Sequence, residues 1–136
     1  MNKKVLLGVD PGRAKTGVAL MTQEGKLVNY AVLLTENFCE ELSLLLTGLE
    51  PQIIVLGNGT TSTEMQETLE KLFPTVALVS VEEGGSTQEA RKLYWEMNPP
   101  TGWRKLLPLG LLVPPGNLDG LAAVVLLQRY LAKKLE

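Results

Sequence analysis

The sequence predicts an α/β fold built on a mixed five-stranded sheet with helices on its faces. Two patterns along the 136 residues carry this prediction. In the first third of the chain, three strand-like segments follow one another with short turns between them, so they must pair as antiparallel neighbours. After that point, apolar strand-like runs alternate with helix-like segments, which is the pattern of parallel strands joined by crossover helices.

The antiparallel part covers residues 3–9, 16–22 and 26–34, with a turn at Gln23-Glu24-Gly25 between the last two segments. A first helix is expected from Thr35, a residue type that caps helices, to the helix-breaking Pro51. An apolar stripe at helical spacing supports this helix: Phe38, Leu42, Leu45, Leu46 and Leu49.

The second half of the chain contains the parallel units. The run Ile53-Ile54-Val55-Leu56-Gly57, which begins with three β-branched residues, predicts a strand buried on both faces. Capping-box patterns at 61–64 and 86–89 predict helices that run to about Phe73 and about Met97, with Glu89 as the capping partner of Ser86. The remaining elements are a strand at 76–81 and a last helix over about residues 118–134.

Length and composition indicate one globular domain over residues 1–136. No apolar stretch reaches the roughly 18 residues of a membrane span and the start lacks a signal-peptide core, so we expect a cytoplasmic protein with no membrane partner. Histidine is absent, which excludes Ser-His and Cys-His nucleophile pairs and histidine metal ligands. The single cysteine, Cys39, lies in a helical pattern and is expected to be a buried small side chain.

Acidic residues mark three places where elements end or begin. The chain has only two aspartates: Asp10 ends the first strand and Asp119 opens the last helix, while Glu82-Glu83 follow the strand at 76–81. Because strand ends define the usual site in such sheets, we expect both aspartates and one of the glutamates to converge. Three carboxylates within about 5 Å repel by roughly 3 kcal/mol per pair at an effective dielectric near 20. Such a cluster needs a proton or a hard cation, Mg²⁺ or Mn²⁺.

Each acid also has an ordinary structural interpretation. Asp10-Pro11-Gly12 is a common type of turn, and glutamates after a strand are often solvated. Asp119 can stabilise the helix dipole, with Asn117 as the cap. The combination of all three acids in this order favours a functional cluster.

Three segments resemble motifs of a known family. Leu7-Gly8-Val9-Asp10-Pro11-Gly12, with Gly17 returning on the next strand, resembles the first motif of RuvC-type Holliday junction resolvases and of the related YqgF (RuvX) group. The segment from Val81 to Ala90 resembles the YqgF motif that carries the catalytic glutamate, here Glu83, and Asn117 to Ala123 resembles the closing motif, with its acid at Asp119. Two positions depart from these motifs: Gly84 replaces the usual arginine, and Gly116 replaces the extra acid of RuvC proteins.

The resemblance implies an RNase H-like fold and a metal-dependent endonuclease, a hydrolase that cleaves phosphodiesters in branched DNA or structured RNA. Asp10, Glu83 and Asp119 would then be the catalytic residues and the ligands of Mg²⁺ or Mn²⁺. Lys15 would neutralise a phosphate beside the metal ions.

Two other functions remain open. Asp10-Pro11-Gly12 followed by Gly17 also resembles the first phosphate loop of the actin and sugar-kinase superfamily, in which an aspartate orients a magnesium nucleotide, although this chain has the length of one lobe only. Alternatively, the chain is a non-catalytic interaction domain that keeps the fold without metal affinity. The acidic pI near 5.3 and Gly84 fit that alternative.

The proline-rich segment from Pro99 to Pro115 contains Trp103 and several leucines, so it must pack on its own domain or on another chain. We expect a surface loop in which Arg104 and Lys105 contact nucleic acid or a second subunit, which makes a homodimer an expectation as well.

Overall fold

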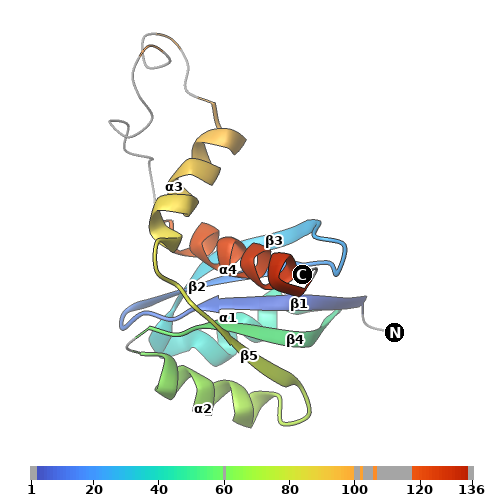
Figure 1. The fold of residues 1–136 in the computed structure, drawn as a ribbon. Helices are drawn as coiled ribbons and strands as arrows, with labels where there is room; N and C mark the ends of the chain where they lie inside the picture. The colour runs from blue at the N-terminus through green and yellow to red at the C-terminus, as the bar shows by residue number, and fades with distance from the viewer. Residues whose placement is uncertain (1–2, 60, 100–101, 103–105, 107–117, 135–136) are drawn as a thin grey trace.

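The computed structural model describes residues 3–59, 61–99, 102, 106 and 118–134, and these form a five-stranded sheet with helices on both faces (Figure 1). In chain order the elements are β1 (Lys3–Asp10), β2 (Lys15–Met21), β3 (Leu27–Leu34), the 3-10 turn η1 (Thr35–Asn37), α1 (Phe38–Leu45), β4 (Leu49–Gly57), α2 (Ser62–Leu72), β5 (Ala77–Val81), α3 (Ser86–Met97) and α4 (Asp119–Lys134).

The strands lie in the order β3-β2-β1-β4-β5. β1 pairs antiparallel with β2, and β2 pairs antiparallel with β3. On the other side, β1 pairs parallel with β4, and β4 pairs parallel with β5. The predicted mixed five-stranded sheet is therefore confirmed, and the carboxyl ends of β1, β4 and β5 meet at one edge.

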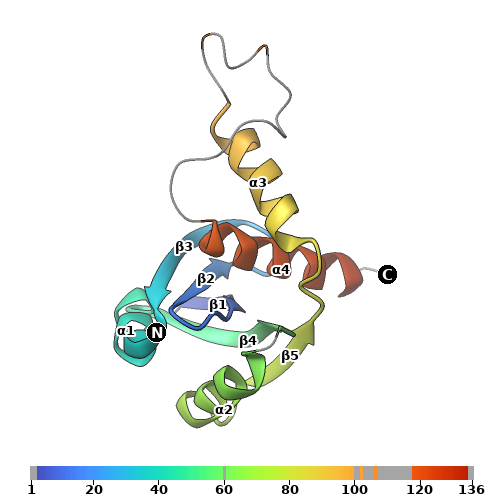
Figure 2. The same ribbon diagram turned by 90° about the vertical axis from the view of Figure 1, so that its left-hand side faces the viewer.

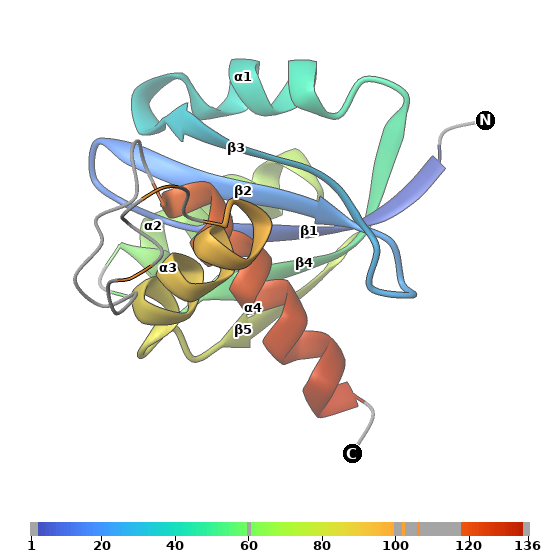
Figure 3. The same cartoon turned by 90° about the horizontal axis from the view of Figure 1, so that it is seen from above.

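Helices α1 and α2 cover one face of the sheet and α4 covers the other, while α3 stands beyond α4 (Figures 1 and 2). Side chains alternate along β1 and so contribute to the hydrophobic cores on both faces of the sheet. Val5, Leu7 and Val9 face α1 and α2, whereas Leu6 faces α4. Seen from above, α4 crosses the sheet and α3 packs mainly against α4 (Figure 3). Every residue of α4 from Gly120 to Leu127 is buried, since the sheet and α3 both cover this helix.

Two glycines allow α4 to lie directly on the strands. A Cβ atom at Gly8 would lie 2.7 Å from Cγ of Leu127 and 2.8 Å from the carbonyl oxygen of Ala123. A Cβ atom at Gly17 would overlap the carbonyl group of Asp119. The strand backbone therefore touches the helix at the two positions that have no side chain.

The first helix is shorter than the apolar stripe predicts. α1 ends at Leu45, and Gly48 adopts a left-handed conformation with a φ of 78° just before β4 begins at Leu49. Pro51 then lies inside β4 and does not terminate a helix. It is tolerated there because β4 pairs with β5 only from Ile53 onward, so one side of β4 has no strand partner at Pro51.

The expected helix caps are wrong at the side-chain level. Thr61 precedes α2 without a side-chain capping bond. The residue before α3 is Gly85, in a left-handed conformation with a φ of 78°, and Glu89 bonds to Arg129 on α4 instead of capping with Ser86. Cys39 was expected to be buried but is exposed.

Within the described residues, none of the helices combines the length and the apolar character that crossing a membrane requires.

Candidate functional site

Asp10 is the last residue of β1, and the chain turns immediately after it toward β2. Leu6 and Gly8 of the same strand face α4, so alternation places the Asp10 side chain on the α4 face as well. In the antiparallel register Asp10 lies opposite Gly17 of β2. The carboxylate therefore emerges where α4 begins.

The first turn of α4 brings Asp119 to this place. The backbone carbonyl of Asp119 lies over Gly17, which is the register partner of Asp10. Asp119 is close enough for its negative charge to raise the pKa of Asp10. Because the contact is made by backbone on backbone, the position of Asp119 depends on a glycine at position 17.

Glu83 arrives from β5, two residues after the strand ends at Val81. Its backbone N–H donates a hydrogen bond of 3.2 Å to Oδ1 of Asn58, which follows β4. Its side chain is in hydrogen-bonding contact with the carboxyl group of Asp10. The structure thus places Glu83 in contact with Asp10, and Asp119 lies near enough to act on Asp10 through its charge.

Only one of the two adjacent glutamates joins this cluster. The backbone carbonyl of Glu82 accepts a 2.7 Å hydrogen bond from Nη1 of Arg129, and Nη2 of the same arginine bonds Oε1 of Glu89 at 2.7 Å. Arg129 therefore ties the end of β5 to α3 and α4, while Glu83 turns toward Asp10. Glu82 is exposed and serves as a natural control for Glu83.

The environment strongly disfavours a charge on Asp10. Burial, repulsion by Glu83, a hydrogen bond with Glu83 and repulsion by Asp119, in that order, raise the pKa of Asp10 from its ordinary value of 3.8 to about 7. A hydrogen bond between two carboxyl groups requires a proton on one of them. At neutral pH the cluster therefore holds a proton for part of the time, and a cation can take the place of that proton.

Glu83 supplies the observation that favours a cation. Its Oε2 atom is buried and has no hydrogen-bond partner among the described residues. An orphaned carboxylate oxygen beside a second buried carboxyl group fits a hard divalent cation, which binds oxygen ligands. Among the described residues no group of three or more acidic or cysteine side chains could hold a metal ion, and Asp10 and Glu83 are the two acids in direct contact.

Two positive side chains follow Asp10: Arg13 lies on the turn and Lys15 is the first residue of β2. Arg13 and Lys15 are both exposed. The hydroxyl of Thr35 holds this turn, because it donates a 2.9 Å hydrogen bond to the carbonyl of Gly12 and lies 2.8 Å from the hydroxyl of the buried Thr16. The sequence suggested Thr35 as a helix cap, but it is instead the residue that fixes the turn. Arg104 and Lys105 lie outside the described residues, as do Trp103 and Asn117.

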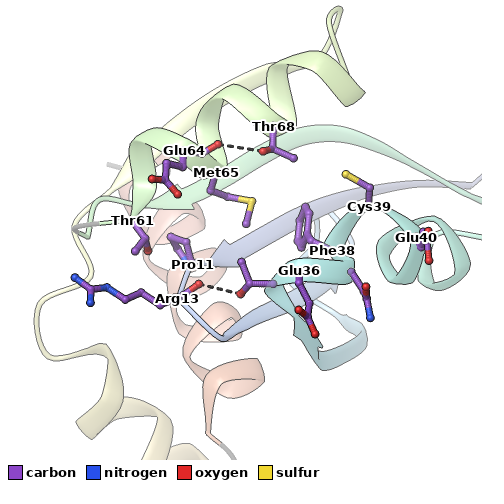
Figure 4. A pocket seen from close by; sticks show the side chains of 13 residues that line it. Pro11, Arg13, Glu36, Phe38, Cys39, Glu40, Thr61, Glu64, Met65 and Thr68 are labelled. Atoms are coloured by element: carbon purple, nitrogen blue, oxygen red, sulfur yellow. Dashed lines mark hydrogen bonds between the residues drawn. The ribbon is translucent and has the colours of Figure 1, made fainter.

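A cavity of about 690 Å³ opens on the opposite face of the sheet, between α1 and α2 (Figure 4). Phe38 and Met65 form its apolar part, and Pro11 and Arg13 lie at the end nearest the turn. None of the three clustered acids lines it. The cavity and the acid cluster therefore share only the turn after β1. We regard the acid cluster as the candidate site, because the carboxyl groups that repel one another lie there.

No family model matches the chain, and no curated protein matches it. Solved structures similar to it include a ROK family transcriptional regulator, a homologue of the E. coli MLC protein, at 11% identity and a TM-score of 0.46. Another is a candidate sugar kinase from Cytophaga hutchinsonii, at 16% identity and a TM-score of 0.43.

The similarity is partial in both cases. The alignments cover 67% and 64% of this chain but only 31% and 38% of those two proteins. The chain thus corresponds to about a third of their length. At TM-scores below 0.5, neither neighbour assigns a function to this chain.

The comparisons correct the expected family. Assignment to the RuvC-like and YqgF family of RNase H-like resolvases is wrong, because no family model matches and the structural neighbours are a ROK regulator and a candidate sugar kinase. The expected hydrolase, an endonuclease for Holliday junctions, other branched DNA or structured RNA, is withdrawn with it. The motif around Asp10 does not by itself identify that family, because Asp10-Pro11-Gly12 followed by Gly17 also resembles the first phosphate loop of the actin and sugar-kinase superfamily.

Proposed function

We propose that this chain is a phosphate-binding module in which Asp10 and Glu83 hold a divalent cation, Mg²⁺ or Mn²⁺, that in turn binds an anionic phosphate ligand. The observation that carries the proposal is the pair of carboxyl groups at the edge of the sheet. Asp10 is partly buried against Glu83, and Oε2 of Glu83 is buried with no hydrogen-bond partner in the part of the chain that the structure describes. Both features become favourable once a cation lies between the two groups.

Two carboxylates suit a cation of this kind. Mg²⁺ usually keeps several waters and binds one or two protein carboxylates together with the oxygens of a phosphate ligand, rather than a closed protein cage. Asp119 adds a third negative charge near Asp10. We assign it to the outer surroundings of the ion, where its charge increases the affinity for the cation.

The turn after Asp10 provides charge for the phosphate. Alternation along β2 places Lys15 on the same face of the sheet as Gly17, which is the face of Asp10 and α4. Arg13 lies two residues earlier, in the turn before β2, and is also exposed. A phosphate bound to the cation would therefore have a positive side chain within reach on the protein side.

A second function, a non-catalytic interaction domain without metal affinity, is favoured by one observation. With a pKa of Asp10 near 7, a proton can lower the negative charge of the cluster without any metal ion. The two functions predict different results when a divalent cation is added: in the phosphate-binding module the cation replaces this proton, and in the interaction domain it does not.

Calorimetric titration with Mn²⁺, in the absence and presence of inorganic pyrophosphate or ADP, separates these functions. We expect one Mn²⁺ site in the parent, a loss of affinity of at least tenfold in Asp10→Asn and in Glu83→Gln, and tighter binding of pyrophosphate when Mn²⁺ is present. Glu82→Gln removes the same charge one residue away and should bind like the parent. A parent that binds neither Mn²⁺ nor pyrophosphate would support the interaction domain.

A further inference from the structure

The carboxylate of Glu83 lies on a short backbone platform formed by Gly57, Asn58 and Gly59 at the end of β4. A Cβ atom built at Gly57 would lie 2.5 Å from Oε2 of Glu83, and one built at Gly59 would overlap Oε1 of the same residue. Both oxygens of the carboxylate therefore occupy space that a side chain at either position would need.

The backbone conformation at these two positions does not explain why they are glycine. Neither Gly57 nor Gly59 has a φ in the left-handed region, unlike Gly48 and Gly85. Any residue could adopt the backbone angles of the platform without that penalty. What the glycines provide is the room that Glu83 fills.

Asn58 connects the platform to β5 in two ways. Its backbone N–H donates a 3.1 Å hydrogen bond to the carbonyl of Val81, which extends the parallel pairing beyond Gly57. Its side-chain oxygen accepts the 3.2 Å bond from the N–H of Glu83. These two bonds hold the backbone of Glu83 in the place from which its side chain reaches back over the glycines.

The surroundings also limit where the carboxylate can go. Cδ1 of Leu126 on α4 lies 3.1 Å from the Cβ position of Gly57, so the space above the platform is shared by Glu83 and an apolar side chain. An apolar wall on one side and backbone on the other leave Oε2 without a hydrogen-bond partner from the described residues. A ligand bound beside Oε2 of Glu83 can supply a partner for this oxygen.

We infer that the Gly57-Asn58-Gly59 platform positions the carboxylate of Glu83 and thereby determines the affinity of the site for a divalent cation. The effect on cation affinity rests on the proposed function. The effect on the position of Glu83 rests only on the contacts between the platform and the Glu83 carboxylate. A side chain on the platform would displace the carboxylate from Asp10 without removing any charged residue.

The contact itself is tested without metal by a double-mutant cycle on thermal or chemical unfolding. Gly59→Ala should destabilise the parent but have little effect in a Glu83→Ala background, because the added methyl group then meets no carboxylate. Gly84→Ala is the matched control, since a Cβ there meets only Oε1 of Glu82 at 3.6 Å, an ordinary contact. Equal effects of Gly59→Ala in both backgrounds would overturn the inference.

The consequence is tested by Mn²⁺ titration of the same variants. Gly59→Ala should stay folded, because the clash is with the end of a flexible side chain, yet bind Mn²⁺ at least tenfold more weakly. In that background Glu83→Asp should recover part of the affinity, since a shorter carboxylate clears the methyl group, although Glu83→Asp alone weakens binding.

These outcomes distinguish the inference from the proposed function. If the parent binds Mn²⁺ and folded Gly57→Ala and Gly59→Ala variants bind it equally well, the platform has no positioning role while the proposed function stands. If the parent binds no Mn²⁺, the proposed function fails, and the unfolding cycle still decides whether the platform holds Glu83.

Discussion

The carbonyl group of Asp119 lies directly over the α-carbon of Gly17, so that the first turn of α4 touches the strand that pairs with β1. The contact places an acidic residue of the last helix beside Asp10, more than a hundred residues earlier in the chain.

Gly17→Ala tests this contact. The added methyl group would meet backbone atoms of Asp119 and Gly120, which cannot move away as a side chain can. We expect a loss of about 3 kcal/mol of unfolding free energy, at the upper end of the usual cost of overpacking, measured by chemical denaturation. Gly84→Ala, where the space is open, should change stability by less than about 0.5 kcal/mol. Similar values for the two variants would mean that α4 can shift away from β2.

Asp10→Asn should raise the melting temperature of the metal-free protein. The amide has the shape of the carboxyl group but carries no charge, so it removes repulsion by Glu83 and Asp119 from a partly buried position. Melting in the presence of a chelator checks this. With Mn²⁺ added, the parent should gain more stability than the variant, and equal gains would exclude Asp10 from a metal site.

The raised pKa of Asp10 also predicts a pH dependence with a definite sign. In the unfolded chain Asp10 loses its proton near pH 3.8, whereas in the folded protein it keeps the proton until about pH 7. The folded state therefore binds more protons between these values, and stability falls as pH rises through this window. We expect the parent to lose about 2 kcal/mol relative to Asp10→Asn between pH 4 and pH 8, after roughly halving the full conversion for solvent screening. A constant difference between the two proteins across this range would contradict the raised pKa.

Arg129 should contribute more to the unfolding free energy than its ion pair with Glu89 alone would. It bonds both the carboxylate of Glu89 and the backbone carbonyl of Glu82, and its side chain is 24% exposed. We expect Arg129→Ala to cost about 1.5 kcal/mol, whereas Glu89→Gln, which keeps the bond to Glu82, should cost less than about 0.5 kcal/mol. Equal costs would show that the bond to the end of β5 contributes nothing.

Much of the fold could be predicted from the sequence because it depends on local patterns. The apolar run at 53–57 begins with three β-branched residues, and the structure pairs it on both sides, with β1 and β5. The end of α1 could not be predicted from its apolar stripe. Gly48 breaks the helix earlier, and Pro51 fits into β4 only because β5 has not yet joined the sheet at that point.

The candidate site was predictable in part for the same reason. The carboxyl ends of parallel strands share one edge, so Asp10 and Glu83 could be expected to meet there. Their roles as metal ligands stay predictions. The partner of Glu89 was not predictable, because Arg129 lies 40 residues away and a capping pattern nearby offered a simpler partner. The platform under Glu83 was also missed, since Asn58-Gly59 looks like an ordinary turn until the space above it is seen to be filled.

The most direct measurement is the number of protons released when Mn²⁺ binds, obtained by calorimetry in two buffers of different ionisation enthalpy. If the cation takes the place of the proton on Asp10, a pKa of about 7 predicts release of about 0.9 proton at pH 6 and about 0.1 proton at pH 8. Asp10→Asn should release none at either pH, and Glu82→Gln should behave like the parent. Mn²⁺ binding with no proton release at pH 6, or no binding at all, would contradict a cation site formed by Asp10 and Glu83.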